Sequence, residues 1–155
     1  MRKLLSIIIL IITGLTFKSC AVIKTESKPV TKVIQIENAD KNKLYVKAND
    51  WMVSAFNNAE SVVQFTDKES GTITGKYLLG TVTDASQYGA ANRVFAIINI
   101  QVKDGASKIT VTPESFQYAK GNLYTLYTEE KANSDVNALI VSFENAMVEE
   151  TTDDW

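Results

Sequence analysis

Residues 93–112 read RVFAIINIQVKDGASKITVT and decide the fold. Successive side chains of a β-strand point to opposite faces of a sheet, so every second residue shares a face. In Arg93–Lys103 one such face is apolar throughout, with Val94, Ala96, Ile98, Ile100 and Val102. Asp104-Gly105 is typical of a hairpin turn, and Lys108–Thr112 then places Ile109 and Val111 on its apolar face. The stretch predicts two antiparallel strands with one face towards the core.

Upstream of this hairpin, the sequence predicts three further strands and a helix. The strands are expected over Lys32–Glu37, Ser61–Thr66 and Thr72–Thr83. Between the first two strands, Asp40 or Asn42 offers an oxygen that can cap a helix. Apolar residues follow at helical spacing, which indicates a buried stripe of Leu44, Ala48, Trp51, Met52, Ala55 and Phe56.

Downstream of the hairpin, an aromatic-rich connection leads to a second helix. The connection covers Phe116–Tyr127, and its aromatic side chains are expected either to pack over a sheet edge or to form a partner surface. Ser134 is the expected N-cap of the helix, with Asp135 complementing the helix dipole. The apolar stripe of this helix comprises Val136, Leu139, Ile140, Phe143 and Met147.

The element order is therefore β-α-β-β-β-β-α, without a series of βαβ crossovers. This order predicts an α+β fold in which an antiparallel sheet of about five strands carries both helices on one face. The other face of the sheet is then partly open, and it is the candidate binding face. Its expected residues are Phe95, Ile97, Asn99, Gln101 and Thr110.

The first twenty residues, MRKLLSIIILIITGLTFKSC, indicate export. A positive start precedes an apolar run of about 14 residues, which suits a signal peptide and is short for a membrane-spanning helix of about 20. The only cysteine, Cys20, follows this run directly and resembles a bacterial lipobox, although Lys18 departs from the common pattern. We expect lipidation of Cys20, with plain secretion or an uncleaved anchor as alternatives.

The chain then divides into four parts. Residues 1–19 are the expected signal peptide, 20–30 the lipidated cysteine and a tether, 31–150 the folded domain, and 151–155 an acidic tail. Removal of the signal leaves 13 basic and 18 acidic side chains, a net charge of −5. An exported acidic domain lacks the basic field that nucleic-acid binding requires, so no nucleic-acid partner is expected.

One segment also carries a family resemblance. Residues 44–79 combine a helix containing Trp51 and Phe56, the triplet Val62-Val63-Gln64, the turn Asp67–Gly71 and the start of the strand Ile73–Lys76. With the later Asp104-Gly105 hairpin, they resemble a bacterial domain family of unknown function that has a TATA-box-binding-protein-like fold. The resemblance spans about residues 30–120. It implies secreted or lipid-anchored relatives and implies no catalytic residues, because function resides in sites rather than in folds.

The residue types restrict the chemistry further. The chain has no histidine and one cysteine, which excludes Ser-His-Asp and Cys-His catalysis and zinc sites that need imidazole. We expect no catalytic residues, metal or cofactor. The alternative is a carboxylate-based hydrolase that pairs distant acids, such as Asp67 or Glu69 with Glu114.

The sequence therefore favours a non-enzymatic, lipid-anchored envelope protein. Its expected contacts are the membrane, through the lipid on Cys20, and a protein partner or a second copy at the open sheet face. A different function remains open, in which the domain carries a small apolar ligand between the C-terminal helix and the sheet.

Overall fold

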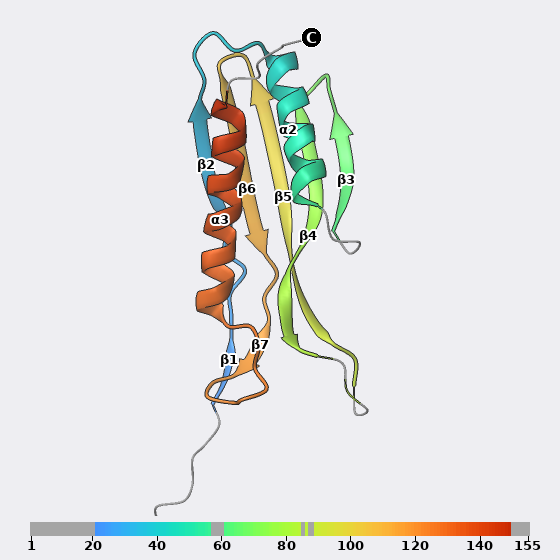
Figure 1. Ribbon diagram of the computed structural model, residues 1–155, viewed down its shortest axis with the longest axis vertical. Helices are drawn as coiled ribbons and strands as arrows, with labels where there is room; N and C mark the ends of the chain where they lie inside the picture. Colours follow the sequence, from blue (N-terminus) through green and yellow to red (C-terminus); the bar gives the residue numbers. More distant parts are fainter. Residues whose placement is uncertain (1–20, 57–60, 85, 87–88, 150–155) are drawn as a thin grey trace, which may run out of the picture.

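A computed structural model describes residues 21–56, 61–84, 86 and 89–149 of the chain. The expected signal peptide, Cys20 and the acidic tail at 151–155 lie outside the described residues. Within them the chain forms an α+β domain, in which two helices lie against one face of an antiparallel sheet (Figure 1). This confirms the fold class that the sequence predicts. No helix in these ranges is long and apolar enough to cross a membrane.

The main sheet has five strands in the order β2-β6-β5-β4-β3, all antiparallel. The strands are β2 (Val30–Gln35), β3 (Val62–Asp67), β4 (Thr72–Thr83), β5 (Asn92–Lys103) and β6 (Ala106–Pro113). The central pair β5–β6 is the predicted hairpin, with Ile100 opposite Ile109 and Ile98 opposite Val111. The five apolar residues predicted for the inner face of β5 are all buried.

Two helices cover this inner face. Helix α2 (Lys41–Ala55) is capped by Asp40, whose carboxylate accepts from the backbone N–H groups of Asn42 and Lys43. Helix α3 (Glu129–Val148) lies beside it (Figure 1). The helices meet where the Trp51 ring packs edge-on against Phe143, with ring centroids 5.1 Å apart. Leu44, Met52 and Phe143 are fully buried, so these apolar stripes form the upper layer of the core.

Helix α3 begins earlier than the sequence predicts. Its N-cap is Thr128, whose hydroxyl accepts from the backbone N–H of Lys131, and Ser134 lies inside the helix. Glu129 and Glu130 occupy the first turn, where carboxylates interact favourably with the helix dipole. The prediction of Ser134 was wrong because the first turn of the helix is polar. The apolar stripe from Val136 starts about two turns after the real cap.

The expected tether is also partly wrong. Val22–Lys24 forms strand β1, which pairs with β7 (Gln117–Ala119) in a separate two-stranded sheet. Thr25 is buried, and its hydroxyl both donates to the carbonyl and accepts from the N–H of Phe116. These two hydrogen bonds satisfy the buried Thr25 hydroxyl and attach strand β1 to the rest of the domain. Folding therefore begins before residue 31, with residues 26–29 as the link to β2.

The aromatic connection packs against the sheet at the same end. Phe116, Tyr118 and Tyr127 are buried, with the rings of Phe116 and Tyr127 5.8 Å apart at their centroids. The Tyr127 hydroxyl donates to Asp135 over 2.9 Å. The Tyr127 ring lies over Gly80, at a point where β4 has a bulge. A Cβ at position 80 would lie 2.5 Å from Cδ2 and 3.0 Å from Cζ of that ring.

The close approach predicts the effect of Gly80→Ala. The Tyr127 ring is buried, packs against Phe116 and is held at its hydroxyl by Asp135, so it cannot simply swing into solvent. We expect a loss of about 1–3 kcal/mol in the free energy of unfolding, measured by urea denaturation, as for other overpacked positions. Gly89→Ala is the matched control, because nothing lies within 4 Å of a Cβ there. Equal stability of the two variants would contradict this packing.

Burial of Tyr127 predicts a specific alkaline pH dependence. Burial and the neighbouring Asp135 raise the pKa of Tyr127 well above its ordinary value. Above about pH 10 the unfolded chain loses this proton while the folded chain keeps it, so stability falls as pH rises. Above about pH 10 we expect the free energy of unfolding of the wild type to fall more steeply with pH than that of the Tyr127→Phe variant. The difference in slope is up to about 1.4 kcal/mol per pH unit. If the free energies of unfolding of the two proteins fell in parallel above about pH 10, Tyr127 would not be the residue responsible.

Candidate functional site

The open face of the sheet carries the residues that the sequence nominated for binding. Phe95, Ile97, Asn99 and Gln101 alternate along β5 with the buried residues under the helices, and they therefore point away from them. Thr110 on β6 stands opposite Asn99, so it shares this face. Neither helix covers that side of the sheet (Figure 1). The structure thus brings the five candidate residues together on one surface.

Polar groups on this face bond to one another across the strands. Asn99 donates to the Thr74 hydroxyl over 3.0 Å, and the hydroxyls of Thr31 and Thr110 are also 3.0 Å apart. Such cross-strand pairs stabilise a sheet by roughly 0.2–1 kcal/mol each. They orient the side chains in advance, so a partner would meet a surface that is already ordered.

Lys76 is the charged residue at the lower part of this face. Its ammonium lies 4.1 Å from the centroid of the Phe95 ring and 3.5 Å from a carboxylate oxygen of Glu114. The cation–π contact and the ion pair are both partly exposed, so each contributes little to stability. Their effect is to neutralise the lysine charge and to hold its stem flat against the sheet.

Exposed apolar side chains at the β3 edge extend the face, and the sequence analysis missed them. Val62 stands opposite Lys76 and Phe65 opposite Thr74, which places both on the open side. They are 48% and 54% exposed. Residues three apart normally point to opposite faces, but a bulge between Val63 and Phe65 restores the shared side. A strict period of two contains no signal for such a bulge.

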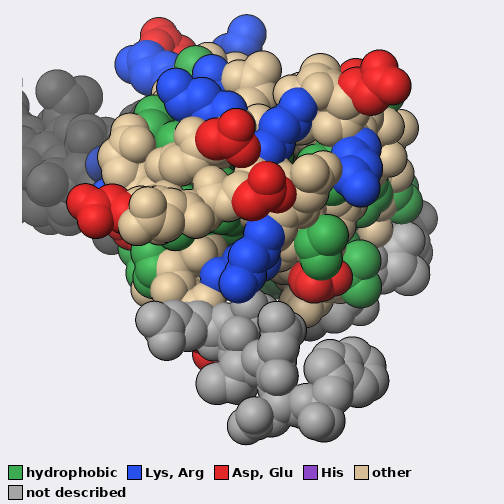
Figure 2. Space-filling model, turned by 90° about the horizontal axis from the view of Figure 1, so that it is seen from above, with side chains coloured by type: hydrophobic (Ala, Val, Ile, Leu, Met, Phe, Trp, Pro, Cys, Tyr) green, Lys and Arg blue, Asp and Glu red, His purple; other side chains and the backbone are tan. Residues whose placement is uncertain are grey.

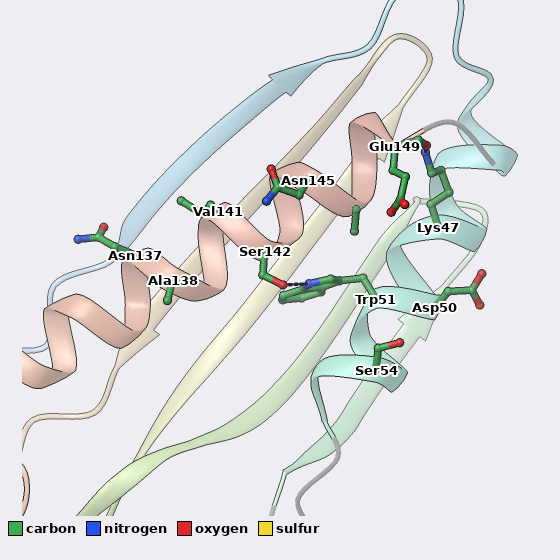
Figure 3. A pocket seen from close by; sticks show the side chains of 11 residues that line it. Lys47, Asp50, Trp51, Ser54, Asn137, Ala138, Val141, Ser142, Asn145 and Glu149 are labelled. Atoms are coloured by element: carbon green, nitrogen blue, oxygen red, sulfur yellow. Dashed lines mark hydrogen bonds between the residues drawn. The ribbon is translucent and has the colours of Figure 1, made fainter. Parts of the chain in front are cut away.

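A groove of about 810 Å³ runs between α2 and α3 on the other side of the molecule (Figure 3). The Trp51 indole N–H donates to the Ser142 hydroxyl over 3.1 Å across its floor. Val141, Ala138 and Asn145 line the α3 side, and Asp50 and Ser54 line the α2 side.

Lys47 closes the upper end of this groove as a structural group. Its ammonium donates to the backbone carbonyls of Met147, over 2.9 Å, and Glu149. A cation at the C-terminus of a helix complements the helix dipole. Partial burial is the main reason that the pKa of Lys47 lies below its ordinary value, with a further contribution from Lys43. Lys47 and Trp51 thus join the two helices, so their polar groups are already in use.

The structure separates the carboxylates that the sequence proposed as a hydrolase pair. Asp67 stands in register with Thr72 and Gln101, whereas Glu114 lies beside Phe95. Six residues along β5 correspond to about 20 Å, well beyond the 5–9 Å that glycosidase carboxylates require. Among the described residues, no three His, Cys, Asp or Glu side chains cluster in a way that could hold a metal ion.

The space between α3 and the sheet, the expected site of a carried ligand, is largely filled. Val136, Phe143 and Met147 point into it and are fully buried. What is left is a surface hollow of about 390 Å³ beside β4, lined in part by Tyr77, Leu79 and Leu139.

Comparisons with known proteins agree with this architecture. The model of the "domain of unknown function (DUF4468) with TBP-like fold" matches residues 31–119. A DUF4468 family protein from Bacteroides ovatus is similar in structure, with a TM-score of 0.51, 18% identity, and coverage of 81% of this chain and 89% of that chain. A TBP-like protein from Parabacteroides distasonis gives a TM-score of 0.53 at 18% identity, with 83% and 97% covered. A search of curated proteins found no match.

The two solved structures support the fold alone, because their sequence identity to this chain is low. The family match covers more than half of the chain and includes α2, the β3–β4 turn and the β5–β6 hairpin. These are the elements on which the predicted family resemblance depends. The chain therefore belongs to the DUF4468 family, whose domains have a TBP-like fold and an unknown function.

Proposed function

We propose that this protein is a lipid-anchored protein of the bacterial cell envelope whose domain binds a protein partner through the open face of its sheet. The observation that carries the proposal is the one-sided cover of the sheet, which leaves Val62 and Phe65 about half exposed on the same face as Phe95 and Ile97. Apolar side chains gathered on one exposed face are typical of interaction sites. This surface supports a binding role for the domain.

The composition of the open face suits a protein better than a small molecule. The face is a sheet surface with aromatic, aliphatic and amide side chains on the central strand β5, threonines on its neighbours β4 and β6, and apolar side chains on β3. β-Branched side chains have few rotamers, so ordering them on binding costs little entropy. The Lys76 charge is already met by Glu114, which lowers the cost of covering it.

The size of the face sets the extent of the contact. Five strands about 4.8 Å apart span about 20 Å, and eight residues at about 3.3 Å each span about 26 Å, which gives roughly 500 Å². A standard interface covers about 800 Å² on each partner. A partner must therefore reach past the sheet face, and the β3 edge with the half-exposed Val62 and Phe65 is the apolar part of its border.

Carriage of a small apolar ligand is less well supported. Its expected site is the space between α3 and the sheet, which Phe143 and Met147 fill. The hollow beside β4 lies at the surface and does not reach into that space as an enclosed cavity.

The lipid anchor predicts the behaviour of Cys20→Ala. Without the thiol no acyl chains can be attached, so we expect the variant to leave the membrane fraction of its host. The measurement is fractionation of cells followed by mass spectrometry of the N-terminal peptide. Lys28→Ala is the control, because it keeps the cysteine and changes an exposed side chain in the link to β2. Retention of Cys20→Ala in the membrane would show that the apolar run at residues 4–17 is the anchor.

The binding face predicts which variant loses its partner in intact cells. Phe65→Lys places a charge on the apolar side of the face, so we expect loss of the chemically crosslinked species that the wild type forms. Val53→Lys is the matched control, since Val53 is exposed on α2, away from this face. A crosslinked species of twice the mass identifies a second copy as the partner. Monomer alone in the wild type, or equal loss in both variants, would refute the proposed face.

A further inference from the structure

The first described residue is fixed at one end of the domain. Ala21 follows Cys20 directly in the sequence, and its carbonyl accepts from the backbone N–H of Lys120 over 2.9 Å. Val22 next to it pairs with Ala119 in the β1–β7 sheet. This sheet lies at the lower end of the molecule in Figure 1. An acyl chain on Cys20 would therefore start beside the residues that follow β7, with no free linker between them.

The segment after β7 is an ordered loop that presents apolar side chains outward. Gly121 has a positive φ of 78°, which turns the chain. The Thr125 hydroxyl donates to the carbonyl of Ala119, and the N–H of Leu126 donates to the carbonyl of Val82. On this braced backbone Leu123 is 95% exposed and Tyr124 is 80% exposed.

Other apolar residues surround this loop. Leu126 and Val22 are more than half exposed. A concavity of about 690 Å³ lies between the loop and the β4–β5 connection, and its lining includes Leu123, Tyr124, Leu126 and Ala90. An exposed leucine alone is ordinary, but several on one braced end, beside the chain start, form a patch. We name Val22, Leu123, Tyr124 and Leu126 the β1-end apolar patch.

The opposite end of the molecule has a different character. Figure 2 looks onto that end and shows Lys, Arg, Asp and Glu side chains interspersed over it. It contains the β3–β4 turn with Lys68 and Glu69 and the β5–β6 turn with Asp104. The end where β1 begins carries exposed charged side chains too, among them Lys24 and Lys120, and in addition the exposed apolar side chains of the patch.

We propose that the β1-end apolar patch inserts into the surface of the phospholipid bilayer in which Cys20 is anchored. The inference rests on the lipid anchor of the proposed function and adds a fixed orientation of the domain. Leucines enter the acyl boundary, and the Tyr124 ring occupies the headgroup region, where an aromatic ring with a polar tip is favoured. The long axis then stands away from the membrane, and the open sheet face stays accessible from the side.

The bilayer is favoured over a protein as occupant by the position of Ala21, the residue that follows Cys20 in the sequence. Its hydrogen bond with Lys120 fixes Ala21 next to this patch, so a lipid attached to the preceding residue would bring the patch to the bilayer. Once one group is attached, a second contact nearby forms at a high effective concentration. A weak apolar contact, too small to bind membranes alone, then suffices.

The test measures the depth of the patch in the lipidated protein. Leu123→Cys is labelled with an environment-sensitive fluorophore in protein purified from host membranes, where Cys20 is acylated and unreactive. The protein is reconstituted in phosphatidylethanolamine and phosphatidylglycerol vesicles that contain a lipid-borne quencher. We expect a blue shift and strong quenching, because interfacial residues lie about 5–10 Å into the headgroup and acyl boundary. The same label on Asp104→Cys, at the charged end, should show neither effect.

A second variant tests whether the quenching depends on the patch itself or only on the nearby lipid anchor. Tyr124→Asp in the Leu123→Cys background should lower the quenching while the amount of protein on the vesicles stays the same. Equal quenching at positions 123 and 104, or a blue shift without quenching, would overturn the membrane contact and leave the anchor intact. Loss of the unsubstituted protein from the vesicles would overturn both the anchor and the orientation.

Discussion

Burial of alternate side chains along β5 is the constraint on which the rest of the structure depends. Val94, Ile98 and Ile100 lie under the two helices, and burial of each such side chain stabilises the fold by about 1.5–3 kcal/mol. A slip of one residue would turn all of them to solvent, so the register is strongly specified. The same alternation forces Phe95 and Ile97 outward. The open face is therefore a direct consequence of how the core is made.

The elements with long, regular patterns could be predicted from the sequence. The β5–β6 hairpin, β4 and the Asp40 cap of α2 were found because period, turn and cap signals agree at each. Three-residue strands have no such period, and β1 and β7 were missed for that reason. The start of α3 was placed too late because its first turn is charged.

The candidate site was predicted in part, and the limits have the same physical origin. The residues on β5 follow from alternation, but Val62 and Phe65 share their face only because of a bulge that no pattern marks. The exposed Leu123 and Tyr124 lie on a loop whose place beside Ala21 depends on long-range pairing. Family membership fixes the fold and leaves the site undefined, so the function has to be argued from the residues of the site.

The domain thus has three distinct surfaces: the end near β1 with its apolar patch, the opposite end with its charged turns, and an uncovered sheet face along the side (Figures 1 and 2). The central claim is that the sheet face is covered by a partner in the cell. Hydroxyl-radical footprinting of intact cells and of the purified protein tests it directly. The account predicts that Phe65 and Phe95 are oxidised less in cells, while Val53 on α2 is oxidised equally in both. Equal oxidation of Phe65 and Phe95 in cells and in isolation would contradict it.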